Sequence, residues 1–194
     1  MKGKSGKRAR TGHPRNQAAA LLLAQALIAL IALPQPTLAA GDNNVYLHGA
    51  LVAEPCVIPP GDEEIPLDFG TIIDKYLYLN TRTPGQAFEI HLEECDLTLG
   101  KTVSVTFTGA ESIALPGLLA LDGGSEATGI AIGLETSSAT PLPLNQASDK
   151  TLLLEGSNSI ALKAYVQGEP DALRDQRIER GPFSAVATFH LEYE

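Results

Sequence analysis

The most regular stretch of the sequence is residues 181–194, where apolar and polar positions alternate. Side chains alternate between the two faces of a β-strand, so this pattern predicts one long strand with an apolar and a polar face. An apolar strand with no further strand after it is a template for pairing with another chain. We therefore expect another chain to supply its missing neighbour. The apolar positions are Gly181, Phe183, Ala185, Ala187, Phe189, Leu191 and Tyr193.

A second alternating stretch, residues 45–52, lies near the beginning of the chain and places Val45, Leu47, Gly49 and Leu51 on one face. A spare strand at one end and an unpaired edge at the other predict head-to-tail polymerisation into open filaments. Glycine weakens a strand and often marks close approach of another backbone, so Gly49 fits a donated strand. A β-bulge inside a complete sandwich is the alternative interpretation of this glycine.

Most of the chain between these two stretches also alternates with a period of two, and the intervening segments are rich in Gly, Pro, Asn, Ser and Thr. Only residues 170–180 are compatible with a helical turn. Seven or eight short strands joined by turns predict an all-β sandwich. The expected internal strands lie at residues 65–69, 88–92, 103–107, 130–134, 152–154 and 160–166.

Residues 1–40 have the composition of a secretory signal peptide. Residues 1–17 carry six Lys and Arg and no acid, and residues 18–33 form an apolar run that precedes Pro34, Pro36 and small residues. This predicts cleavage after Ala39 or Ala40. A membrane anchor is the alternative, but sixteen residues interrupted by Gln25 are short for a span of ~20 residues.

Removal of this segment makes the chain strongly acidic. The whole chain has 14 basic and 23 acidic residues, and the 154 residues that remain hold 8 and 23, a net charge of −15. Nucleic acid and anionic membrane surfaces are therefore unfavourable partners, whereas a basic protein is compatible.

Both cysteines, Cys56 and Cys95, lie in the exported part of the chain. An even number of cysteines in an exported chain predicts a disulfide bond, and two cysteines without other ligands make a poor metal site. The chain-entropy model gives such a bond about 4 kcal/mol of stabilisation.

The sequence offers little for catalysis or cofactor binding. Three histidines follow residue 40, namely His48, His91 and His190, and all occupy outward positions of alternating strands. His91 lies between Glu89 and Glu93 and superficially suggests a metal, but such polar residues are usual on the solvated face of an antiparallel strand. An enzyme such as a copper–zinc dismutase needs clustered histidines. We therefore predict no enzyme activity and no cofactor.

Several motifs together resemble the subunits of chaperone–usher pili, of the type 1 and P-pilus kind. Gly181, fourteenth from the end, and the penultimate Tyr193 match the carboxyl-terminal signature of that family. The resemblance covers essentially all of the exported chain. Its further motifs are Val45-Tyr46-Leu47-His48-Gly49, Pro55-Cys56, Phe69-Gly70, Phe88-Glu89-Ile90-His91-Leu92 before Cys95, Gly129-Ile130-Ala131-Ile132, Ala164-Tyr165-Val166 and Ala187-Thr188-Phe189-His190-Leu191-Glu192-Tyr193.

The resemblance implies an incomplete immunoglobulin-like β-sandwich that lacks its last strand and is completed by a donated one. The expected organisation is a signal peptide (1–40), a donor-strand arm (41–54) and a pilin domain (55–194). In this family a periplasmic chaperone first lends a strand beside the terminal strand and contacts the terminal carboxylate, here that of Glu194. At the outer-membrane usher the arm of the next subunit replaces it, and the subunit becomes part of the cell-surface fimbrium.

Three further motifs resemble minor tip adaptors more than rod pilins: Leu115-Pro116-Gly117, Ala164-Tyr165-Val166 and Glu169-Pro170-Asp171-Ala172-Leu173-Arg174. The resemblance therefore implies a minor or adaptor subunit, with a major rod pilin as the alternative within the family. A different class of function is a self-contained secreted sandwich that binds a glycan or a protein. Its binding platform would consist of Tyr46, Tyr76, Tyr78 and Tyr165.

Overall fold

The computed structural model describes residue 45 and residues 47–194, and divides the chain into residues 1–49 and a compact unit of residues 50–194. The predicted signal peptide lies outside the described residues, as do 41–44 and 46 of the predicted arm. Residues 45 and 47–49 belong to no helix or strand. None of the helices in the described part of the chain has the length and hydrophobicity that a membrane span requires.

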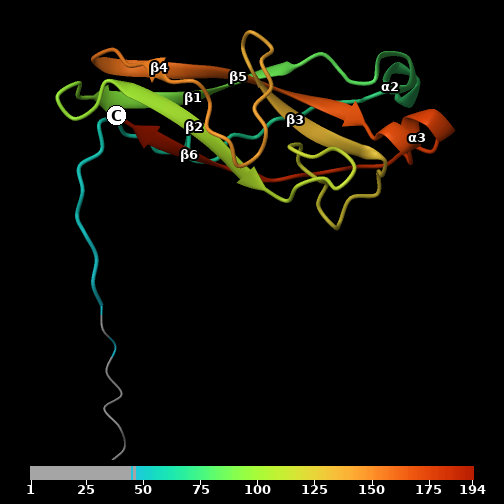
Figure 1. Ribbon diagram of the computed structural model, residues 1–194, viewed down its shortest axis with the longest axis horizontal. Coiled ribbons are helices and arrows are strands. Elements are labelled where there is room, and N and C mark those ends of the chain that lie inside the picture. The colour runs from blue at the N-terminus through green and yellow to red at the C-terminus, as the bar shows by residue number, and fades with distance from the viewer. Residues whose placement is uncertain (1–44, 46) are drawn as a thin grey trace, which may run out of the picture. The chain divides into compact units, whose positions relative to one another are not determined.

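The compact unit consists of two antiparallel three-stranded sheets (Figure 1). The first has the order β1-β5-β3, with β1 at Gln86–Cys95, β5 at Gly156–Gly168 and β3 at Ile130–Thr136. The second has the order β4-β2-β6, with β4 at Thr151–Leu152, β2 at Thr102–Gly109 and β6 at Ala187–Tyr193. The predicted all-β, two-sheet class is confirmed.

One hydrophobic core joins the two sheets. It receives side chains from every strand except β4, such as Ile90 and Leu92 from β1 and Val103 and Val105 from β2, all four of them buried. The rings of Phe88 and Phe107 meet edge to face across the sheets, with centroids 6.4 Å apart. Burial of each such side chain contributes about 1.5–3 kcal/mol, so the period-two pattern is the main determinant of the fold.

Two short helices lie at one end of the sandwich (Figure 1). α3 (Pro170–Asp175) occupies the segment for which a helical turn was expected. α2 (Asp74–Asn80) was not predicted, because its Tyr-Leu-Tyr-Leu pattern has the period of a strand. Distant residues hold it: Arg180 donates two hydrogen bonds of 2.6 and 3.0 Å to Asp74, and Ile178 N donates to Tyr78 Oη at 3.1 Å.

Three expected strands differ from the structure, which has six strands among the described residues rather than seven or eight. β6 begins at Ala187 and not at residue 181, because the preceding stretch pairs with a loop through single hydrogen bonds, such as Asp122 N to Ser184 O at 2.8 Å. Residues 65–69 join no ladder. The strand expected at 152–154 is the two-residue β4, at 151–152.

A nearly buried ion pair fixes the outer face of the first sheet. Glu135, whose side chain is 2% exposed, accepts a hydrogen bond from Arg82 Nη1 at 2.8 Å. The guanidinium lies 4.0 Å from the ring centroid of Tyr165. Gly133 pairs with Tyr165, and a Cβ there would lie 2.2 Å from the ring, so only glycine leaves room for it.

His91 connects β1 to the segment that precedes residues 65–69. Its Nδ1 lies 2.9 Å from Asp62 Oδ2, and its Nε2 lies 3.5 Å from Glu89 Oε2. The hydrogen bond to Asp62 and the negative charges of both carboxylates raise the pKa of His91. Two main-chain bonds of 2.9 and 2.8 Å between Val57 and Glu93 hold the same segment. His91 therefore links β1 to the chain around Asp62 at the surface. The described residues contain no cluster of metal-ligand side chains.

Replacing Arg82 with Met should destabilise the domain, because Glu135 would remain buried without its partner. Breaking a buried pair in this way costs ~3–5 kcal/mol, and the partial exposure of Arg82 places the expected loss at the lower end of that range. Urea denaturation would measure it. The matched control is Arg174→Met, whose exposed pairs with Asp171 and Asp175 should contribute little to stability. Equal losses in both variants would contradict the role of Glu135.

The raised pKa of His91 predicts a pH-dependent contribution to stability. The folded state binds the proton more tightly than the unfolded state, whose histidine pKa is about 6.5. The stabilisation that protonated His91 provides is fully present below the unfolded-state pKa and is lost as the pH rises through the raised pKa of the folded state. The melting temperature of His91→Gln should therefore fall below that of the unmodified chain at pH 5.5, and the difference should narrow by pH 8. His190→Gln, on the outer face of β6, is the control. A difference in melting temperature that widens as the pH rises would contradict the stabilising role of the His91–Asp62 contact.

Candidate functional site

The candidate site is the outer edge of β6. This strand pairs with β2 over seven residues, from Ala187 opposite Gly109 to Tyr193 opposite Val103. It is the last strand in the order β4-β2-β6, so no strand of the described chain pairs with its other side. Main-chain N–H and C=O groups on that side are thus available to water or to an added strand.

The side chains of β6 and the residues before it are only partly covered. Thr188, His190 and Glu192 are exposed, whereas the alternate apolar residues pack against the core but stay half-buried. Core strands elsewhere bury their inward side chains almost completely. The incomplete burial indicates that a neighbour is missing beside this strand. The half-buried residues are Phe183, Ala185, Ala187, Phe189, Leu191 and Tyr193.

Residues 65–69 form a second extended stretch with the same pattern. Ile65, Leu67 and Phe69 are half-buried against the core, and Pro66 and Asp68 are exposed. Residues 63–72 make no main-chain to main-chain hydrogen bond in the described structure. The two stretches meet where the rings of Phe69 and Phe183 lie with centroids 6.2 Å apart. We call β6 and residues 65–69 together the open edge.

The Phe69 end of the open edge adjoins a cavity and a helix. The cavity has a volume of about 340 Å³ and lies between the first turn of α2 and the beginning of β1. Near Phe69, Gln86 Nε2 donates to the main-chain oxygen of Asp68 at 2.7 Å. This single bond from a side chain holds residues 65–69 in place of a main-chain ladder. The cavity is lined by Phe69, Thr71, Ile72, Ile73, Tyr76, Thr83, Pro84 and Gln86.

The opposite end of β6 is anchored to β2 and to the beginning of the domain. The carbonyl oxygen of Glu194 accepts hydrogen bonds from Lys101 N and Thr102 N at 2.6 and 2.9 Å. Burial and the negative charge of Glu54 raise the pKa of Tyr193. Pro55 packs against Gly100, which leaves no room for a side chain there. The predicted arm therefore joins the domain beside the last residues of β6.

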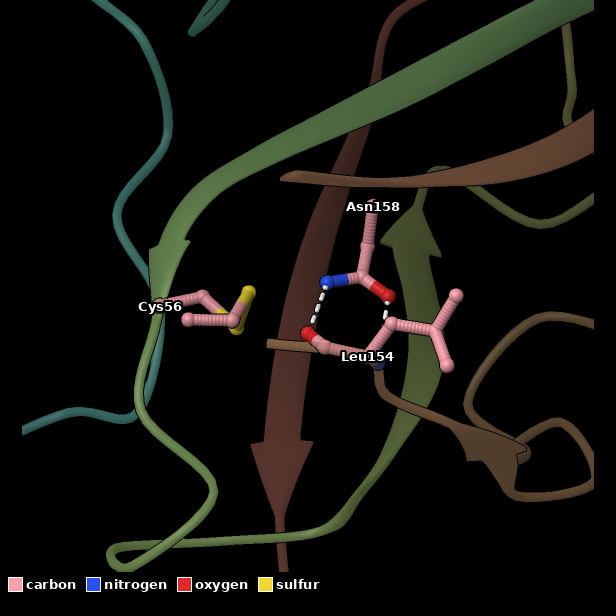
Figure 2. The surroundings of a disulfide bond; sticks show 4 residues. Cys56, Leu154 and Asn158 are labelled. Carbon is pink, nitrogen blue, oxygen red and sulfur yellow. Dashed lines mark hydrogen bonds between the residues drawn. A yellow bond between two sulfur atoms is a disulfide. The ribbon is translucent and has the colours of Figure 1, made fainter. Parts of the chain in front are cut away.

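The predicted disulfide bond is present between Cys56 and Cys95, whose Cα atoms are 4.1 Å apart. Figure 2 shows it beside Leu154 and Asn158. The bond fixes the first residues of the domain to the last residue of β1, so the chain enters residues 65–69 from a rigid position.

The remaining predicted residues fall into two groups. The expected pairing residues from Phe183 to Tyr193 lie along the open edge, whereas Gly181 is exposed and outside β6. The donor-strand residues Val45, Leu47, Gly49 and Leu51 are exposed, and their role stays a prediction. Sequence reasoning identified residues 65–69 as extended but missed that they form the second side of the site. Their alternation, which matches that of residues 183–193, was the available signal.

The tyrosine platform expected for a glycan-binding sandwich is not formed as predicted. Tyr165 is 5% exposed and lies beneath Arg82, so it is unavailable to a ligand. Tyr78 accepts a hydrogen bond from Ile178 N through its hydroxyl group. Tyr46 lies outside the described residues.

Comparison with known proteins identifies the family of the chain. The family model described as "Fimbrial protein" matches residues 45–194. The chain is 33% identical to the fimbrial adapter PapK of Escherichia coli, over 78% of this chain and 88% of PapK. It is 32% identical to the putative minor fimbrial subunit PmfF of Proteus mirabilis, with coverages of 89% and 98%. Fimbria A protein of Serratia marcescens is also 32% identical, with coverages of 79% and 86%.

Solved structures agree with these sequence relatives. The P pilus rod subunit PapA matches with a TM-score of 0.63 and 25% identity, over 73% of this chain and all of the PapA chain. A chain from a chaperone–usher pilus matches with a TM-score of 0.62 and 27% identity, over 82% of this chain and all of that one. The chain therefore belongs to the fimbrial protein family and is a structural subunit of surface pili, which assemble from neighbouring subunits, rather than an enzyme.

Proposed function

We propose that the subunit polymerises by strand donation: the arm of another subunit pairs with the open edge, and its own arm pairs with a further subunit. The observation that carries this proposal is the half-buried apolar face of β6 on an unpaired edge. In β-augmentation the main-chain ladder supplies affinity and alternate side chains supply specificity. An arm with Val45, Leu47, Gly49 and Leu51 on one face has the matching period.

The same edge suits a temporary partner during export. Before polymerisation its apolar side chains would be exposed to other unfolded or partly folded chains, which makes aggregation the expected fate of a lone subunit. A periplasmic chaperone that lends a strand would cover them, and an outer-membrane usher would then exchange that strand for the arm of the next subunit. We include both partners in the proposal, with signal-directed export through the periplasm as the route.

We further propose that this subunit occupies a minor or adaptor position in the fibre. The motifs around Leu115, Tyr165 and Pro170 support this position, as does the similarity to PapK and PmfF. A major rod pilin is the alternative, because the major MR/P fimbria protein of Proteus mirabilis is similarly close, at 31% identity.

Filling the open edge should stabilise the chain strongly. We compare residues 41–194 with the same chain carrying a copy of residues 42–54 attached through a short flexible linker after Glu194. Burial of the three apolar side chains of the copy, Val45, Leu47 and Leu51, should contribute about 5–9 kcal/mol. This corresponds to a rise in melting temperature of about 10–30 °C. Calorimetry would measure the two melting temperatures. Sedimentation should show a monomer in place of aggregates for the chain with the attached copy.

Two variants of the attached copy test whether the predicted face is the one that pairs. Leu47→Asp should remove most of the gain, because it would bury a charge, whereas His48→Asp, on the opposite face, should retain it. If the unmodified chain is already a stable monomer and the copy changes nothing, the sandwich is complete without a donated strand and the proposal fails.

The adaptor position predicts a low copy number. Immunogold labelling of assembled pili against this subunit should give isolated particles, at about one position per fibre, because an adaptor occurs only at a junction. An antibody against the major subunit of the same pilus is the control and should label the whole length. Continuous labelling with the antibody against this subunit would instead identify it as a rod pilin.

A further inference from the structure

Two side-chain contacts tie α2 to the residues that follow α3, at the end of the sandwich where both helices lie (Figure 1). Arg180 donates from Nε and Nη2 to Asp74 Oδ2, at 3.0 and 2.6 Å, and Ile178 N donates to Tyr78 Oη at 3.1 Å. The other carboxylate oxygen of Asp74 accepts from Lys75 N at 2.8 Å. The Asp74 side chain is 13% exposed and that of Arg180 is 80% exposed, so an exposed arginine holds a largely covered carboxylate.

The Arg180–Asp74 pair joins the two sides of the open edge. Four residues separate Asp74 from Phe69, at the end of one side, and two separate Arg180 from Phe183, at the beginning of the other. The rings of Phe69 and Phe183 meet at the same place, but no main-chain hydrogen bond joins residues 63–72 to β6 in the described structure. Among the ion pairs of residues 47–194, Arg180–Asp74 is the one that spans the open edge.

Residues 65–69 depend on their flanks for their position. Three prolines within residues 59–66 have no N–H group, so the main-chain pairing of Val57 with Glu93 does not continue along β1. The disulfide bond and this pairing fix the chain before residues 65–69. α2 follows them, and its contacts with Ile178 and Arg180 fix the chain on the other flank. A segment without a ladder of its own opens readily when one flank is released.

A donated strand requires a defined distance between the two sides. Neighbouring strands lie ~4.8 Å apart, so a strand between β6 and residues 65–69 needs their main chains about 10 Å apart. When that distance is set in advance, the arm binds without having to order residues 65–69. When it is not, the cost of ordering them lowers the affinity for the arm.

We propose that Arg180 is a positioning residue for strand donation: through Asp74 and α2 it holds residues 65–69 at the distance from β6 that an arm requires. The proposal rests on strand donation and adds the residue pair that keeps the open edge preformed. Arg180 acts through Asp74 and not by touching the arm. Because its side chain is exposed, the pair contributes little to global stability, and an effect on arm binding is separable from an effect on folding.

The test measures how residues 41–194 release a probe arm. The probe is a fluorescent peptide of residues 41–54, whose alternating face makes it a model of a donated strand. Its release after addition of unlabelled peptide is followed by fluorescence anisotropy. Arg180→Gln should release the peptide about three- to tenfold faster, because changes within one interface act mainly on the dissociation rate.

Three further variants show whether the pair is responsible. Arg174→Gln is the matched control, because the partners of Arg174 lie within α3, and release should change less than about twofold. Arg180→Lys keeps the charge but not the two donors of the guanidinium group, so its release rate should be intermediate. Asp74→Asn should resemble Arg180→Gln, and the two changes together should have no further effect, as expected for coupled residues.

Trypsin separates a loss of position from a general loss of stability. Cleavage after Lys75, in the first turn of α2, reports local opening, whereas cleavage after Lys163, within β5, reports unfolding of the whole domain. Arg180→Gln should accelerate cleavage after Lys75 and leave cleavage after Lys163 unchanged.

The outcomes distinguish the two proposals. If the unmodified chain does not capture the peptide, strand donation by this arm fails, and the role of Arg180 fails with it. If the peptide is captured but Arg180→Gln and Asp74→Asn release it at the unmodified rate, the positioning role is wrong while the open edge stands. Faster release together with faster cleavage after Lys163 would also contradict that role. Faster release with faster cleavage after Lys75 alone supports it.

Discussion

The fold depends on one unsatisfied edge. β6 uses one side of its main chain to pair with β2, and its inward side chains stop halfway to full burial. Water can satisfy the free N–H and C=O groups, but it cannot cover Phe189 or Leu191. An added strand would satisfy the main-chain groups through its ladder of hydrogen bonds, and its inward side chains would cover the apolar side chains of β6 along the same length. A small ligand would cover the apolar surface and leave the main chain unpaired, so the edge favours a peptide segment.

The rest of the domain stabilises the sandwich without closing that edge. The disulfide bond, the Val57–Glu93 main-chain pair and the His91–Asp62 contact all act on the chain before residues 65–69. They position the second side of the site although it has no ladder of its own. The Arg82–Glu135 pair and the ring of Tyr165 stabilise the outer face of the other sheet. Each of these interactions lies away from the outer side of β6, so stability and an open edge are compatible.

Sequence periodicity predicted the strands whose alternate side chains form one buried face. β1, β2, β3 and β5 were expected because their alternate residues are buried, and the disulfide bond because the chain has only two cysteines. The beginning of β6 was misplaced because β2 ends at Gly109, opposite Ala187, and alternation cannot show where a partner strand ends. α2 was missed because Arg180 and Ile178, about a hundred residues later, decide its conformation. Burial of Glu135 was equally invisible, since its partner is 53 residues away.

Strand pairing alone leaves the relation between consecutive domains undefined. A paired arm fixes a register, but it does not by itself set the orientation of the domain that follows. Identical subunits with a net charge of −15 repel each other on average, yet only charges within a Debye length of ~8 Å interact appreciably at physiological salt. What matters is therefore which side chains come into contact rather than the total charge.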